Sequence, residues 1–172
     1  MTRTVDRIPV GVADLVRRPG RQRRVELDAH FDGLATSAAT VPADRPVHLD
    51  LVLESVPGSI VVTGTAEAPW TGECRRCLGP VEGSATARLR EIFERDPEEG
   101  ETYLLAGDEL DLAPMVREAL VLELPLAPVC REDCAGLCPR CGADRNEVAC
   151  GCDLEVRDPR WAALDELRLP DA

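Results

Sequence analysis

Apolar and polar residues alternate in several stretches of the first hundred positions, and a period of two is the pattern of half-buried β-strands. The clearest stretch has an apolar side chain at every second position: Val47, Leu49, Leu51 and Leu53. Similar patterns predict strands at 23–29, 59–70 and 84–93, with Gly64 marking a bulge or bend in the second of these. Consecutive strands with a tight turn at Pro57-Gly58 predict an antiparallel meander.

A helical pattern follows at 111–124. Asp111 can cap its N-terminus, and Pro114 is tolerated in the first turn. Pro125 ends the helix, because a proline disfavours helical geometry in the residue before it. The stripe that would cover the sheet is apolar: Leu112, Val116, Ala119, Leu120 and Leu124. Shorter helices are expected at 12–17 and, after Asp158-Pro159, in the tail.

Cysteines are the most distinctive part of the composition, with eight in 172 residues. Six lie within 130–152, and the other two lie at 74–77, in the turn between two predicted strands. No apolar run is long enough to span a membrane, and the N-terminus lacks the apolar stretch of a signal peptide. We therefore expect a cytoplasmic protein with no membrane partner, in which reduced thiols serve metal or redox chemistry rather than disulfides.

The spacing of the thiols predicts two zinc sites, because four thiolates complete a tetrahedron around this ion. One set follows C-x2-C-x8-C-x-C: Cys138, Cys141, Cys150 and Cys152. The other set joins the hairpin to the segment after the main helix: Cys74, Cys77, Cys130 and Cys134. A single zinc ion, or an exchange of partners between Cys134 and Cys138, is the alternative. Nearby arginines can offset the negative charge of the sites: Arg75, Arg76, Arg131 and Arg140.

A thiol redox or iron–sulfur protein is another use of the same cysteines. Redox chemistry is disfavoured at 74–77, because a strand follows and no helix N-terminus lowers the thiol pKa. The chain has two histidines, His30 and His48, and no phosphate-binding glycine loop or nucleophile elbow. Four thiolates leave zinc no open position, so we expect structural sites, no catalytic residues, no enzyme activity and no small-molecule substrate.

The formal net charge of −12 argues against nucleic-acid binding over the whole surface. The charge is uneven, however, and five basic residues crowd into one segment: Arg17, Arg18, Arg21, Arg23 and Arg24. These are the tentative RNA-binding residues, with a solvated turn as the alternative interpretation. Glu118 is interpreted as a solvated helix charge, with an anchor for an arginine near the metal as the alternative.

The predicted fold class is α+β, an antiparallel β-meander or partly open barrel covered by one main helix, with a C-terminal cysteine-rich zinc module. The length suffices for one core and a small appendage. Residues 1–128 are predicted to form the core domain, which carries the cysteine hairpin at 74–77. Residues 129–172 are predicted to form a zinc-binding tail that ends in a short helix and packs on the core.

Several motifs together resemble the YceD family, the large ribosomal RNA subunit accumulation proteins. They are Leu15-Val-Arg-Arg-Pro-Gly, Glu73-Cys-Arg-Arg-Cys-Leu, Leu124-Pro-Leu-Ala-Pro-Val-Cys130, Gly136-Leu-Cys-Pro-Arg-Cys-Gly and Asp158-Pro-Arg. The resemblance implies a cytosolic bacterial protein linked to accumulation of large-subunit ribosomal RNA. It also implies that the site with Cys130 and Cys134 is shared in the family, and that the 138–152 block is an addition.

The sequence and the resemblance together predict a non-enzymatic ribosome-biogenesis factor that is stabilised by zinc. Its expected partner is ribosomal RNA, or a large-subunit ribosomal or assembly protein. The first alternative is a zinc-stabilised acidic adaptor between proteins that makes no contact with RNA. The second is the thiol redox or iron–sulfur protein.

Overall fold

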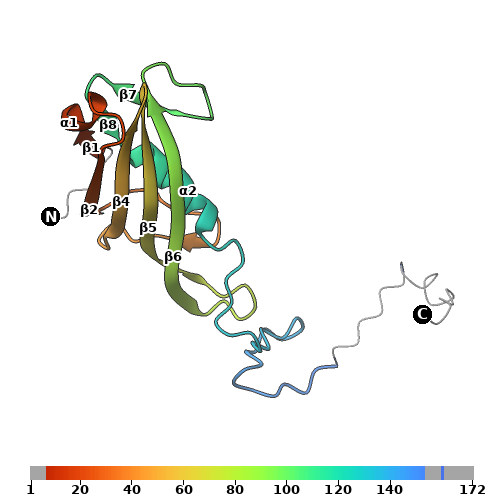
Figure 1. The fold of residues 1–172 in the computed structure, drawn as a ribbon. Coiled ribbons are helices and arrows are strands. Elements are labelled where there is room, and N and C mark those ends of the chain that lie inside the picture. Colours follow the sequence, from red (N-terminus) through yellow and green to blue (C-terminus); the bar gives the residue numbers. More distant parts are fainter. Residues whose placement is uncertain (1–6, 154–159, 161–172) are drawn as a thin grey trace, which may run out of the picture.

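A computed structural model describes residues 7–153 and residue 160 (Figure 1). Its elements in chain order are β1 (Pro9–Gly11), α1 (Ala13–Val16), β2 (Gln22–Ala29), β3 (Ala39–Thr40), β4 (Val47–Val56), β5 (Ser59–Glu73), β6 (Pro80–Glu94), β7 (Tyr103–Ala106), β8 (Glu109–Asp111) and α2 (Ala113–Glu123).

The strands form one sheet in the order β1-β8-β7-β6-β5-β4-β2, and β3 pairs with β5 beside this path. The pairs β2–β4, β4–β5 and β5–β6 are antiparallel, which confirms the predicted meander. The sheet curls into a half-barrel, and α2 lies across its inner face (Figure 1). The structure therefore confirms the predicted fold class, a mostly-sheet architecture with one main helix.

The core fills the inner face of this half-barrel. The alternating residues of β4 are fully buried there: Val47, Leu49, Leu51 and Leu53. The helix α2 buries Met115, Val116 and Leu120 against them, and α1 contributes Leu15. The alternation that predicts the strands thus arises because every second side chain leaves water for one common core.

Gly64 marks a close approach of two backbones and no bulge. The pairing of β5 with β4 runs through it without an extra residue, with Leu51 opposite Gly64. A Cβ at this position would lie 2.1 Å from the carbonyl oxygen of Asp50, and its φ is +146°. The bulge interpretation is therefore wrong, and the glycine is required because the adjacent strand leaves no room for a side chain.

The ends of the sheet differ most from the sequence-based prediction. The N-terminal segment, for which the sequence predicts a short helix at 12–17, also contains β1, which pairs with β8. After the acidic segment 96–101, β7 runs parallel to β6 at two positions, and a turn then leads into β8. Asp111 ends β8 and accepts hydrogen bonds from the backbone N–H groups of Ile8 (2.8 Å) and Ala113 (3.1 Å), so it ties β1 to the start of α2.

The chain after α2 contains no further regular helix or strand up to residue 153 and folds around its cysteines. The structure places this segment against the β5–β6 hairpin, at the end of the half-barrel opposite α1 (Figure 1). The predicted terminal helix lies outside the described residues, and a division at 128 stays a prediction. Neither helix of the described part is long and apolar enough to cross a membrane.

Candidate metal centre

The first group of thiols joins segments that are far apart in the sequence. Cys74 and Cys77 lie in the turn between β5 and β6, and Cys130 and Cys134 lie in the segment after α2. Their four Sγ atoms lie within 4.8 Å of one another. Cys74 and Cys134 are buried, and Cys130 is exposed. We call these four residues the hairpin quartet.

The second group is local. Cys138, Cys141, Cys150 and Cys152 have Sγ atoms that also lie within 4.8 Å of one another. Cys138 is buried, whereas Cys141 is exposed. We call these residues the tail quartet, and the two groups have the membership expected from the spacing.

Both quartets begin with the same backbone turn. In the hairpin quartet, the N–H of Leu78 donates to the carbonyl oxygen of Cys74 (2.8 Å), and the N–H of Cys74 donates to Gly79 (2.8 Å). In the tail quartet, the matching bonds join Gly142 to Cys138 (2.9 Å) and Cys138 to Ala143 (2.8 Å). Each turn directs two thiols of a C-x-x-C motif to one side.

The residue after each C-x-x-C motif has a positive φ, +60° for Leu78 and +74° for Gly142. A left-handed conformation is needed here to close the turn after the second thiol. Leu78 is the one non-glycine residue of the described chain in this conformation. Its side chain is 59% exposed, so burial does not repay the conformational cost.

The distances between sulfur atoms fit a tetrahedral metal site. The Sγ atoms of Cys74 and Cys134 are 3.9 Å apart, and those of Cys77 and Cys130 are 3.8 Å apart. A zinc ion with Zn–S bonds of about 2.3 Å has tetrahedral edges of about 3.8 Å. A disulfide would bring the sulfurs to about 2.05 Å, and all eight cysteines are free thiols. The donor set and its spacing therefore fit zinc.

The four thiols of a quartet favour different ionisation states when no cation is present. Hydrogen bonds from the backbone N–H groups of Cys77 and Cys130 lower the pKa of Cys74 to about 6. The Cys134 thiol next to Cys130, together with burial, raises the pKa of Cys130 to about 12. The tail quartet repeats this, because the N–H groups of Cys141 and Arg140 lower the pKa of Cys138 to about 6. Four thiolates this close require a cation to balance their mutual repulsion.

Asn146 connects the two quartets. It belongs to the loop between Cys141 and Cys150, yet its Nδ2 donates to the Sγ of Cys134 (3.4 Å). Its Oδ1 accepts from the Nη2 of Arg131 (2.7 Å) and from the N–H of Ala135 (2.8 Å). A side chain from the loop of the tail quartet therefore hydrogen-bonds both the 131–135 segment and a sulfur of the hairpin quartet. The thiol spacing gives no signal for this residue.

Arg76 holds the hairpin against the segment after α2. Its Nη1 donates to the carbonyl oxygens of Glu132 (2.7 Å) and Cys134 (3.0 Å). The backbone of Arg76 accepts from the N–H of Leu137 (2.9 Å), and a Cβ on Gly136 would lie 2.8 Å from the same carbonyl oxygen. Of the arginines expected to offset the site charge, Arg76 and Arg131 thus bind the loop of the hairpin quartet.

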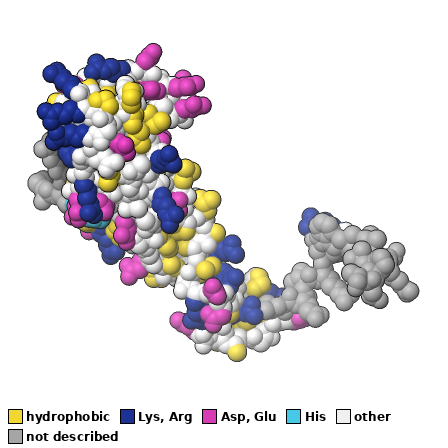
Figure 2. Space-filling model, in the orientation of Figure 1, with side chains coloured by type: hydrophobic (Ala, Val, Ile, Leu, Met, Phe, Trp, Pro, Cys, Tyr) yellow, Lys and Arg dark blue, Asp and Glu magenta, His cyan; other side chains and the backbone are white. Residues whose placement is uncertain are grey.

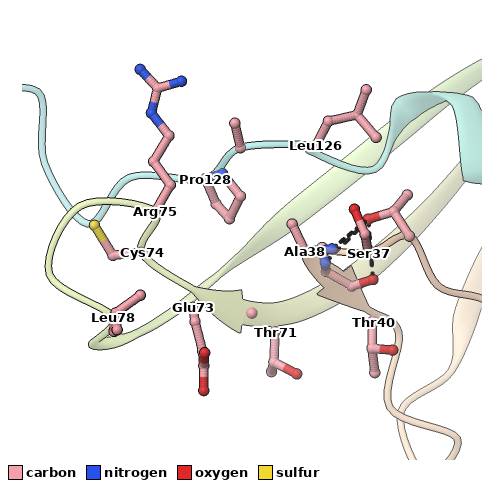
Figure 3. A pocket seen from close by; sticks show the side chains of 14 residues that line it. Ser37, Ala38, Thr40, Thr71, Glu73, Cys74, Arg75, Leu78, Leu126 and Pro128 are labelled. Atoms are coloured by element: carbon pink, nitrogen blue, oxygen red, sulfur yellow. Dashed lines mark hydrogen bonds between the residues drawn. The ribbon is translucent and has the colours of Figure 1, made fainter.

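A pocket of about 370 Å³ lies beside the hairpin quartet, between β3, the end of β5 and the segment after α2 (Figure 3). Leu78 and Leu126 lie at its two ends, and the Arg75 side chain points away from it (Figure 3). The hydroxyl of Thr36 on its wall is hydrogen-bonded to backbone groups, including the carbonyl oxygen of Pro125 (3.3 Å). The lining residues include no histidine, so no imidazole lies beside the hydroxyl of Thr36 to act as a base.

The tentative RNA-binding arginines lie near α1 and β2, where Figure 2 shows basic side chains gathered at the end of the molecule away from the quartets. Arg23 pairs with Asp14 (2.8 Å), and Arg24 makes two bonds to Asp50 (2.8 and 2.7 Å). Arg21 lies 3.9 Å from Asp14. Arg17 and Arg18 are exposed and form no ion pair with a described residue.

The other polar candidates lie away from the thiols. His48 is exposed and binds Asp28 (2.9 Å), and His30 lies 3.2 Å from the carbonyl oxygen of Ala43. Glu118 accepts a hydrogen bond from the hydroxyl of Tyr103 (2.7 Å) on the α2 side of the sheet. The interpretation of Glu118 as an anchor for an arginine near the metal is therefore wrong.

Comparison with known proteins places this architecture in a family. The model of the family "Large ribosomal RNA subunit accumulation protein YceD" matches residues 62–168. The uncharacterized protein Rv2926c of Mycobacterium tuberculosis is 37% identical over 171 residues, which cover 95% of this chain and 82% of that protein. The Arabidopsis thaliana "Large ribosomal RNA subunit accumulation protein YCED homolog 1, chloroplastic" is 33% identical over 105 residues, 52% of this chain and 33% of that protein.

A third relative, YlbN of Bacillus subtilis, is 29% identical over 103 residues, which cover 57% of this chain and 60% of that protein. No solved structure matches. The family match includes most of β5, all of β6 and α2, and all eight cysteines. The chain therefore belongs to the YceD family of large ribosomal RNA subunit accumulation proteins.

Proposed function

We propose that this protein supports accumulation of large-subunit ribosomal RNA as a non-enzymatic assembly factor. The observation that carries the proposal is the family match over 62–168, which spans the central hairpin, α2 and both quartets. The name of the Arabidopsis relative describes the same role for that protein.

Each quartet is proposed to hold one structural zinc ion. Four thiolates fill all positions of a tetrahedral zinc, so no position remains for a catalytic water. The hairpin quartet joins β5 and β6 to the segment after α2, and the tail quartet folds a separate loop onto it through Asn146. Zinc in these sites would supply folding free energy rather than reactivity. Reduced thiols also favour the cytoplasm as the place of action.

The proposed partner is ribosomal RNA or a large-subunit ribosomal or assembly protein. Arg17 and Arg18 support RNA contact, since both are exposed and unpaired among the described residues. The net charge of −12 supports the second candidate, an adaptor that binds a basic protein and does not touch RNA.

The experiment is recovery of the tagged protein from cells, with sequencing of the bound RNA and mass spectrometry of the bound proteins. We expect enrichment of precursors of large-subunit ribosomal RNA, and of large-subunit proteins, over a tagged unrelated protein. Depletion of the protein should lower large-subunit ribosomal RNA relative to small-subunit RNA. Background levels in the recovery, together with an unchanged RNA ratio after depletion, would disprove the proposal.

A pair of variants separates RNA contact from the adaptor function. Arg17→Ala with Arg18→Ala removes two unpaired charges without breaking an ion pair among the described residues. Arg90→Ala with Arg95→Ala removes the same charge from two exposed positions in β6 and directly after it, and is the control. Loss of RNA in the first variant alone supports direct RNA contact. Equal RNA recovery in both variants supports the adaptor.

A further inference from the structure

A groove runs between α2 and the edge of β6 that faces away from β5, and the loop between β6 and β7 closes one end. Its volume is about 720 Å³, within the range of binding clefts. Its lining includes the apolar side chains of Ala87, Met115, Ala119 and Leu122. The Leu122 side chain is 85% exposed, although it belongs to a helix with a buried face. Ala87 and Met115 are buried, so the apolar surface that the described chain leaves uncovered in the groove is mainly that of Leu122.

Glu91 breaks the pattern of the strand that borders this groove. The inward positions of β6 before and after it are buried and apolar: Ala85, Ala87, Leu89 and Phe93. Glu91 occupies the same face, half-buried, where an apolar residue would complete the core. A carboxylate in such a position costs stability, and a break in an otherwise consistent pattern marks a functional position.

The groove holds further carboxylates and lacks cations to match them. Glu118 on α2 lies near enough to raise the pKa of Glu91, after the larger effect of burial. Glu99, Glu101 and Glu123 also line the groove. Within residues 7–153, none of these five glutamates forms an ion pair. Arg88 at the rim is the one basic lining residue, at an outward position of β6.

The edge of β6 beside the groove has no partner strand over most of its length. β6 pairs with β5 from Pro80 to Glu94, but it pairs with β7 only at Phe93 and Glu94. Among the described residues, the edge from Pro80 to Ile92 is open. An open edge can accept an extended segment through main-chain hydrogen bonds, while its side chains select the sequence.

We propose that this groove binds an extended, Lys/Arg-rich segment of a protein partner, which pairs with the open edge of β6 and places a basic side chain between Glu91 and Glu118. Charge complementarity selects this occupant, because the carboxylates attract Lys and Arg and repel the phosphates of RNA. The choice of a large-subunit protein as the source of the segment rests on the proposed function. Proteins that bind ribosomal RNA carry the basic segments that such a groove recognises.

The test uses the full chain with a photo-crosslinking amino acid in place of Leu122. The probe is the mixture of proteins extracted from purified large ribosomal subunits and freed of RNA. After irradiation, mass spectrometry identifies the cross-linked segment. We expect one main product, a Lys/Arg-rich segment of a basic protein, with a yield that falls as salt rises.

Two double variants with the same change in charge provide the control. Glu91→Gln with Glu118→Gln keeps the size of both side chains and should lower the cross-linking yield at least about fivefold, since charge pairs at an interface can contribute more than 1 kcal/mol. Glu26→Gln with Glu54→Gln removes two charges from β2 and β4, away from the groove and the open edge of β6, and should leave the yield within about twofold. Circular dichroism verifies that both variants are folded.

The inference is overturned if both double variants cross-link equally, if the captured segments are not basic, or if no protein segment is captured. Sedimentation of cell extracts distinguishes this failure from failure of the proposed function. If cross-linking fails but the wild-type protein and the Glu91→Gln, Glu118→Gln variant both sediment with large-subunit precursors, the proposed function stands and the groove inference does not. If the wild-type protein cross-links to a basic segment but does not sediment with precursors, the groove inference stands and the proposed function does not.

Discussion

Leu78 and Gly142 occupy the same position in two equivalent turns, and only one of them suits it. A left-handed φ costs a residue with a Cβ about 1–2 kcal/mol, whereas glycine adopts it freely. Leu78 lies at one end of the pocket in Figure 3 with most of its side chain in water. Its conformation is therefore held by the turn, in which the N–H of Leu78 donates to Cys74 and the N–H of Cys74 donates to Gly79.

We expect Leu78→Gly to be more stable than Leu78→Ala by about 1 kcal/mol. Both variants lose the same exposed side chain, and only the alanine keeps the conformational cost. Urea unfolding of the zinc-loaded protein measures the difference. Equal midpoints for the two variants would mean that the turn relaxes without a left-handed residue.

Asn146 is the residue whose role is least visible in the sequence. Asn146→Ala removes the N–H donor to the Sγ of Cys134 and the acceptor for Arg131 and Ala135. We expect the hairpin quartet to lose about 10–100-fold in zinc affinity, as is typical when a partner of a metal ligand is removed. Competition with a fluorescent chelator measures this affinity. Glu147→Ala, an exposed neighbour, is the control and should leave the affinity unchanged.

At the scale of elements, the position of Gly64 opposite Leu51 fixes how closely β4 and β5 approach. Gly64→Ala should destabilise the protein by about 3–5 kcal/mol, because its Cβ would overlap the carbonyl oxygen of Asp50 and its φ is positive. Thermal and urea unfolding measure the change. Gly11→Ala in β1 is the matched control, since a Cβ there would meet nothing within 4 Å, and it should change stability by less than about 1 kcal/mol.

The long elements could be predicted from the sequence, and the short ones could not. The β4, β5 and β6 strands repeat the period of two over 10 or 15 residues, and α2 is delimited by its prolines. By contrast, β1 and β8 have 3 residues each, too few for a period to emerge. Their pairing depends on Asp111, whose carboxylate binds the backbone before β1 and at the start of α2. A contact across about a hundred residues leaves no local signal.

At the scale of the whole molecule, the two quartets should differ in what they stabilise. Cys74→Ser removes a buried thiol of the quartet that joins the sheet to the segment after α2, so with zinc bound there as proposed it should unfold or strongly destabilise the core. Cys150→Ser affects the tail quartet and should mainly loosen residues beyond 136. Hydrogen exchange of β5 and β6 amides separates the two outcomes. Core amides that are equally protected in both variants would contradict this division.

Metal content is a second property of the whole chain. Anaerobically purified protein should contain two equivalents of zinc and show no visible colour, and each serine variant should lose one equivalent. Elemental analysis and an absorption spectrum measure both quantities. A brown protein with iron and sulfide would instead support the iron–sulfur alternative.

The thiol groups of the candidate site could be predicted because the C-x-x-C spacing is recognisable in the sequence. The Asn146 bridge could not be predicted, since a single amide between two cysteines looks like any loop residue. The groove beside α2 was also hidden. Glu91 interrupts the alternation of β6, but only the structure shows that this interruption faces Glu118 across an open strand edge.

The sequence positions of the hairpin quartet also determine when, during synthesis of the chain, its four thiols can come together. Cys77 and Cys130 are 53 residues apart, so at about 5–20 residues per second the ribosome needs roughly 3–10 s to supply the second half of the ligands. During this interval, the nascent β5–β6 hairpin carries two unprotected thiols. If zinc binds there as proposed, it can join the hairpin to the segment after α2 only once α2 has been synthesised, so zinc binding would be a late step in the folding of each chain.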